Sequence, residues 1–196
     1  MGINSPQPFS EAPTSPNLRH LFIALRGIDA NPDAIASEDS PDWHELAPEL
    51  ASDPIQIDLM TISLSGASCA SSLTRKVIVR AEEYRRIRLR LVSDQPAAAD
   101  PLPKHNECGS RSFNCVVDTS GYTHALALKD GERSLLISSD HIADGFFSVL
   151  PDTETRLSIV FDPYSSLATS VGDAVEVSPV LSAETARGCT PSSSSP

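Results

Sequence analysis

The sequence predicts an all-β protein, a single antiparallel β-sandwich of about seven to eight strands with extended Pro/Ser-rich tails. Three observations lead to this fold class. Apolar residues alternate with polar ones over short segments, which is the period of a half-buried strand. Prolines and glycines punctuate the chain between these segments, and long helical periodicity is scarce. The 196 residues, 40% of them apolar, are enough for one domain with its own core.

The chain divides into a folded domain over residues 18–182 and two tails. Residues 1–17 are Pro-rich and predict an extended segment, and residues 183–196 end in a linker-like Ser/Pro run. Helix is expected only as a turn or two near residues 40–50 and over residues 81–85. An Asp-Gly pair at residues 130–131 predicts a β-hairpin between the apolar runs that flank it.

The predicted core consists of the alternating apolar residues of successive strands. Side chains of a strand point to opposite faces in turn, so these residues are expected to line the two inner faces of the sandwich. Trp43 is expected to cover one end. The core set is Leu21, Ile23, Leu25, Ile57, Leu59, Ile87, Leu89, Leu91, Leu126, Leu128, Leu157, Ile159, Phe161, Val175 and Val177.

The charge balance limits the partners. The chain has 15 basic and 26 acidic residues, a net charge of −11, and phosphate contacts need a basic face. We therefore expect no nucleic-acid partner. No apolar run reaches the roughly 18–20 residues of a membrane span, so no transmembrane segment is expected either.

Three arginines share one face of a predicted strand. Arg86, Arg88 and Arg90 alternate with apolar residues, so all three point the same way. One interpretation is a stripe for an anionic partner, such as a polysaccharide, a lipid headgroup or an acidic protein surface. The other is a solvated face whose arginines pair across the sheet with the abundant acids.

The four cysteines predict disulfides. Four cysteines allow three pairings; Cys108 and Cys115 flank a short polar loop whose closure costs little entropy, so they form the expected pair, and Cys69 would then join Cys189. Free thiols are the alternative, and a metal site is disfavoured by the lack of metal-ligand spacing. Disulfides indicate an oxidising compartment outside the cytoplasm. Residues 1–5 lack the charged start and apolar stretch of a signal peptide, so the signal segment is expected not to be present in this chain.

One group of residues could form a loop site for a ligand. Asp140, His141 and Asp144 lie close together in the sequence, and Asp162 follows a later strand. Their oxygens and imidazole could bind a divalent cation, although a polar turn between strands explains the same composition.

No motif indicates catalysis or a cofactor. The chain contains no GxSxG elbow, no HExxH or CxxC metal motif and no glycine-rich phosphate loop. We therefore expect a protein that is not an enzyme, with no catalytic residues, no resident metal and no cofactor.

A collinear series of short motifs resembles a family of bacterial secreted or lipid-anchored proteins, Domain of Unknown Function 4382. The resemblance covers roughly residues 9–182. Its motifs are Glu11-Ala12-Pro13, the strand over residues 18–28, Trp43, Ile57-Asp58-Leu59-Met60, the run of residues 84–89, Asp130-Gly131, Ile137-Ser138-Ser139, Phe161-Asp162 with Ser165-Ser166, and Val177-Ser178-Pro179-Val180.

This resemblance implies an extracytoplasmic β-sandwich, with a lipid anchor upstream of this chain and no enzymatic activity. The sequence departs from the family pattern at two positions, with Glu83 where glycine is usual and Glu11 where aspartate is usual. The segment between Cys108 and Cys115 is a further departure, because it is an insertion particular to this protein.

The expected function is a non-catalytic binding or structural module of the periplasm or cell surface. Its partners would be other envelope or surface proteins, in a membrane complex, an adhesin or a filament. The alternative is a small-ligand module that binds carbohydrate or Ca²⁺ through its end loops. Low aromatic content, 5% of residues, disfavours carbohydrate stacking.

Overall fold

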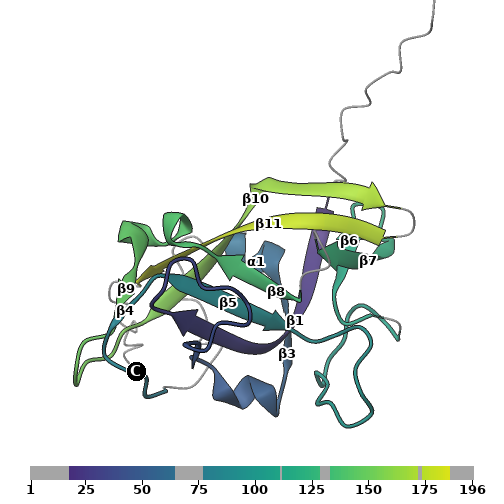
Figure 1. The fold of residues 1–196 in the computed structure, drawn as a ribbon. Helices are drawn as coiled ribbons and strands as arrows, with labels where there is room; N and C mark the ends of the chain where they lie inside the picture. Colours follow the sequence, from purple (N-terminus) through teal and green to yellow (C-terminus); the bar gives the residue numbers. More distant parts are fainter. Residues whose placement is uncertain (1–17, 65–76, 111, 129–132, 172–173, 186–196) are drawn as a thin grey trace, which may run out of the picture.

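The protein is built almost entirely from β-strands. The computed structural model describes residues 18–64, 77–110, 112–128, 133–171 and 174–185. Its strands form one nine-stranded sheet and a separate two-stranded sheet (Figure 1). The all-β prediction is therefore confirmed, whereas its division into two facing sheets stays a prediction.

Strand β1 (Leu18–Asn31) organises the large sheet, because four shorter strands pair along its two edges. Phe22 lies opposite Asp58 on one side and Cys115 on the other, and Asp29 lies between Glu45 and Arg88. One edge of β1 thus carries β6 and then β5, and the other edge carries β3 and then β2. These four strands are β2 (His44–Glu45), β3 (Ile55–Asp58), β5 (Arg86–Leu91) and β6 (Cys115–Asp118).

The strand order across the sheet is β10-β11-β7-β6-β1-β5-β8, so further strands follow β6 on one side and β5 on the other. The added strands are β7 (Thr123–Leu128), β8 (Ser134–Ile137), β10 (Leu157–Val171) and β11 (Ala174–Thr185). Long β10 and β11 form an antiparallel pair at one side of the molecule (Figure 1). β11 continues past the predicted domain boundary at residue 182, and the predicted tails over residues 1–17 and 186–196 lie outside the described residues.

Two details of the predicted topology are wrong. The sheet is mixed rather than wholly antiparallel, because β11 runs parallel to β7. The chain between these strands is long enough for the crossover that a parallel pair needs. The runs flanking Asp130-Gly131 also do not pair as a hairpin, since β7 pairs with β6 and β11 while β8 pairs with β5. The Asp-Gly pair itself lies outside the described residues.

Helical turns are short, and one of them lies in a region predicted to be helical. A 3₁₀ turn (Pro48–Ala51) begins with proline, whose fixed φ suits a helix start, within the region expected to be helical. Residues 83–84 are a strand, β4 (Glu83–Tyr84), paired with β9 (Phe147–Ser148). The other turns are α1 (Leu59–Leu64), η3 (Ser139–His141) and η4 (Ala143–Gly145). Among the described residues, no helix is long and apolar enough to cross a membrane.

The predicted core is confirmed, since every residue of the predicted set is buried or packs partly buried against the core. Tyr84 and Phe147 add an aromatic pair that the strand pattern did not predict. Their stacked rings are 5.1 Å apart, and the Tyr84 hydroxyl donates to the carbonyl of Arg80 at 3.0 Å. Burial, assisted by the Glu82 carboxylate, raises the pKa of Tyr84 to about 12, so this ring stays neutral at physiological pH.

Candidate functional site

Strand β1 contains a β-bulge at Arg26, where its pairing with β5 shifts by one residue. Leu25 lies opposite Leu91 and Gly27 lies opposite Arg90, so Arg26 is one extra residue on β1. Before the bulge, the core-facing residues of β1 are odd-numbered; after it they are Ile28 and Ala30. The bulge therefore shifts the alternation of the strand, and bulges commonly re-aim a side chain in this way.

The Arg90 guanidinium lies directly on the backbone of Gly27. A Cβ atom on Gly27 would come within 2.4 Å of Arg90 Nη2 and 2.6 Å of its Cζ, so only glycine leaves room for this arrangement. Two acids hold the guanidinium there. Nε is 2.9 Å from Asp29 Oδ2, and Nη2 is 2.6 Å from Glu45 Oε1.

Arg88 shares the same aspartate. The Asp29 side chain is only 2% exposed, and its Oδ2 lies 2.8 Å from Arg88 Nη2 and accepts a hydrogen bond from Arg88 Nε at 2.9 Å. The ring of Trp43 lies beneath the Arg88 guanidinium, with 4.3 Å between Cζ and the ring centroid. The indole N–H donates to the carbonyl of Ser37 at 2.9 Å, so Trp43 lies on this arginine face.

The predicted stripe of Arg86, Arg88 and Arg90 is thus half-buried beneath the segment that precedes β2. Arg86 Nη1 donates to the carbonyl of Ala34 at 3.0 Å, and Arg88 Nη1 donates to that of Glu38 at 2.5 Å. Arg86 and Arg88 therefore attach this segment to β5 through hydrogen bonds to its backbone carbonyls, whereas the ion pairs of Arg88 and Arg90 join β5 to β1 and β2. A role toward an anionic partner stays a prediction.

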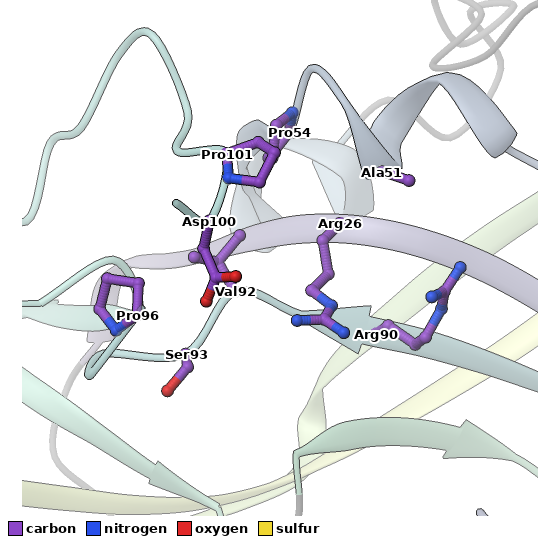
Figure 2. A pocket seen from close by; sticks show the side chains of 9 residues that line it. All are labelled: Arg26, Ala51, Pro54, Arg90, Val92, Ser93, Pro96, Asp100 and Pro101. Atoms are coloured by element: carbon purple, nitrogen blue, oxygen red, sulfur yellow. The ribbon is translucent and has the colours of Figure 1, made fainter. Parts of the chain in front are cut away.

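Beside the bulge, a small pocket opens between β1, β5 and the residues that follow β5 (Figure 2). Its volume is about 190 Å³. Arg26 and Arg90 both line it, and Arg26 has no hydrogen-bond or ion-pair partner within the described ranges. The lining residues are Arg26, Ala51, Pro54, Arg90, Val92, Ser93, Pro96, Asp100 and Pro101.

The polar groups on the other side of the pocket are held by local turns. One Asp100 carboxylate oxygen accepts the N–H of Ala97 at 2.8 Å. The Ser93 hydroxyl oxygen accepts the N–H of Gln95 at 3.1 Å, which leaves its own proton free to donate. Sequence reasoning did not find this pocket. Its one local signal is the spacing from Leu25 to Ile28, which breaks the period of two next to Gly27.

The predicted loop site is a set of turns. The Ser138 hydroxyl donates to Asp140 and thereby lowers the pKa of that carboxyl, and His141 Nδ1 lies 3.9 Å from Asp140 Oδ2. Asp144 adopts a left-handed conformation with φ of 63°, and Asp162 lies within β10 opposite Val180. The described part of the chain contains no group of three or more metal-ligating side chains. Binding of Ca²⁺ or carbohydrate there stays a prediction.

Other histidines form one-to-one pairs with acids. His20 Nδ1 lies 2.7 Å from Asp58 Oδ2, and His44 Nε2 lies 3.3 Å from Glu82 Oε1. His124 Nε2 lies 3.2 Å from Asp118 Oδ2, and this hydrogen bond lowers the pKa of Asp118. His20 and His44 each lie 38 residues from their acid and meet it only in the fold, so spacing alone gave no signal for these two pairs.

The disulfide between Cys108 and Cys115 is confirmed, with 5.6 Å between the two Cα atoms. Gln56 fixes the loop that this disulfide closes: its Nε2 donates to the carbonyl of Phe113 at 2.8 Å, and its Oε1 accepts the N–H of Glu107 at 2.7 Å. The other predicted pair, Cys69 and Cys189, lies outside the described residues.

No protein-family model, no curated protein and no solved structure matches this chain.

Proposed function

We propose that this protein is a non-catalytic binding module of the extracytoplasmic space, an accessory subunit of an envelope or surface assembly. The outer edge of β10 carries this proposal. β10 is a 15-residue strand that ends the sheet and, within the described residues, pairs only with β11 (Figure 1). A strand at the edge of a sheet can serve as a template for a strand of another protein.

One segment of this edge is regular and one is interrupted. The pairing with β11 shifts between Asp162 and Leu167, where the Ser166 hydroxyl donates to the carbonyl of Asp162 at 2.6 Å and accepts the N–H of Val180 at 2.9 Å. This irregularity, together with Pro163, blunts the middle of the edge. Residues 157–160 precede it and pair regularly with β11, so we assign the partner strand to this stretch.

Three further observations support the location and the fold. The Cys108–Cys115 disulfide is favoured by an oxidising compartment. The resemblance to Domain of Unknown Function 4382 implies the same compartment, with a lipid anchor upstream. Ile142, just after β8, bridges Ala183 of β11, so the two ends of the strand order approach each other. A sheet that folds back in this way fits a two-layer β-sandwich.

A charge placed at the edge tests the proposal. Val160 lies opposite Ser182 on the face away from the core, while its neighbours Phe161 and Ile159 face the buried residues Leu181 and Ala183. Val160→Lys therefore adds a lysine to the edge without entering the core. Ser182→Lys is the matched control, with the same charge on the same face one strand farther inward.

The measurement is photo-crosslinking in the native envelope, with the crosslinking residue at Ser158 next to the edge. We expect one protein adduct that disappears in Val160→Lys and persists in Ser182→Lys, followed by identification of that protein by mass spectrometry. An adduct that survives Val160→Lys, or that forms equally from a crosslinker at the exposed residue Asp152, would contradict the proposal.

A further inference from the structure

We propose that the pocket beside the β1 bulge binds a compact organic carboxylate at the guanidinium of Arg26. This inference is independent of the β10 edge, because no residue of β10 lines the pocket. It begins with the bulge, which adds Arg26 to β1 at the point where Gly27 admits the Arg90 guanidinium. Arg26 and Arg90 come from adjacent strands and both line one small cavity (Figure 2), where the Arg90 guanidinium is directed away from Ser93 and Asp100.

The charges of the two arginines are balanced unequally. Arg90 has Asp29 and Glu45 as partners through Nε and Nη2, and its Nη1 has no partner among the described residues. Arg26 is exposed and has no partner in the same ranges. The acid of the lining, Asp100, accepts the N–H of Ala97. Arg26 therefore keeps its N–H donors available, and its positive charge favours an external anion in the cavity.

The form of the donors favours a carboxylate. A guanidinium presents parallel N–H groups that match the two oxygens of a carboxylate. The Ser93 hydroxyl, which already accepts the Gln95 N–H, offers its proton to the same ligand. Asp100 lies in the same lining, and its negative charge disfavours a doubly charged anion such as hydrogen phosphate. A singly charged carboxylate fits this combination better.

The walls and the volume indicate an organic body of limited size. Ala51, Pro54, Val92, Pro96 and Pro101 supply apolar surface, and the prolines are stiff. The cavity of about 190 Å³ is smaller than the roughly 300–1,000 Å³ of pockets that take drug-sized ligands. The ligand is therefore a small molecule or a single acidic group rather than a polymer chain.

The test is titration of the isotope-labelled protein with sodium benzoate, followed by NMR of its backbone amides and arginine side chains. Benzyl alcohol has the same ring without the charge, and inorganic phosphate has charge without the ring. We expect saturable shifts around the pocket with benzoate, weaker binding of phosphate and no binding of benzyl alcohol.

Variants of Arg26 and Asp100 connect this binding to the pocket. Arg26→Ala should weaken benzoate binding by about tenfold or more, the size expected when a charge-assisted pair of hydrogen bonds is lost. Asp100→Asn should strengthen phosphate binding, because it removes the repelling charge. Arg19→Ala removes another exposed β1 arginine that does not line the pocket and should leave benzoate binding unchanged.

Several results would overturn the proposal. Equal benzoate affinity in Arg26→Ala and the wild type would show that Arg26 does not bind the carboxylate, provided that the amide spectrum shows a folded protein. Tighter binding of phosphate than of benzoate would replace the carboxylate with an inorganic anion. Equal binding of benzyl alcohol would show that charge plays no part.

Discussion

Arg88 and Arg26 lie on neighbouring strands of the same sheet, in opposite surroundings. The Arg88 side chain is 14% exposed; it contacts Asp29, donates to the Glu38 carbonyl and covers the Trp43 ring. Arg26 is exposed, and the described part of the chain offers it no partner. The acids of this protein are thus placed selectively. Arg88, on the covered face of the sheet, is paired with an acid, whereas the guanidinium of Arg26, beside the pocket, is available to a ligand.

The largest expected effect comes from removing the shared acid. Asp29→Asn leaves the half-buried Arg88 without its carboxylate partner and Arg90 with Glu45 alone, and breaking a buried pair in this way typically costs about 3–5 kcal/mol. We expect a loss of that size in the free energy of unfolding, measured by urea denaturation.

The control for Asp29 is an exposed ion pair. Asp53 lies 2.6 Å from Lys104, with both side chains more than half exposed. Asp53→Asn should change the free energy of unfolding by at most about 1 kcal/mol. Similar costs for the two substitutions would show that the Asp29 cluster has no special role in stability.

A smaller effect is expected from filling the space beneath Arg90. Gly27→Ala would place a methyl group 2.4 Å from Arg90 Nη2, so the guanidinium must move away from Asp29 and Glu45. We expect a loss of about 1–2 kcal/mol in the free energy of unfolding, within the range for hydrogen bonds to charged groups.

A double-mutant cycle with Arg90→Ala identifies the cause of this loss. If the methyl group acts by displacing the guanidinium, Arg90→Ala should cost less in the Gly27→Ala background than in the wild type. Strictly additive costs would indicate that alanine disturbs the backbone of the bulge instead.

The sequence predicted the paired region of this comparison better than the pocket. Alternation identified the strands and the core, and the polar loop between Cys108 and Cys115 identified the disulfide. The same alternation placed Arg86, Arg88 and Arg90 on one face, but it could not show which acids they meet. Asp29 meets Arg88 and Arg90 only through the pairing of β1 with β5, and Arg26 reaches the pocket only through a one-residue bulge. Both depend on register, which local periodicity does not determine.

A still smaller loss in the free energy of unfolding is expected at the aromatic ring beneath Arg88. Trp43→Phe keeps an aromatic face but removes the indole N–H that donates to Ser37 and reduces the attraction to the guanidinium. The hydrogen bond is worth about 0.5–1 kcal/mol and the attraction to the guanidinium is weakened but not lost, so a combined loss of about 1 kcal/mol is expected in urea denaturation. No loss would show that the covering segment holds its position through the backbone contacts of Arg86 and Arg88 alone.

The smallest effect on stability is expected at Arg26 itself. Arg26→Ala removes an exposed side chain without a partner in the described residues, so the free energy of unfolding should change by no more than about 0.5 kcal/mol. A loss of more than about 1 kcal/mol would show that Arg26 contributes to the fold as Arg88 does. In that case its free guanidinium would no longer indicate a ligand site.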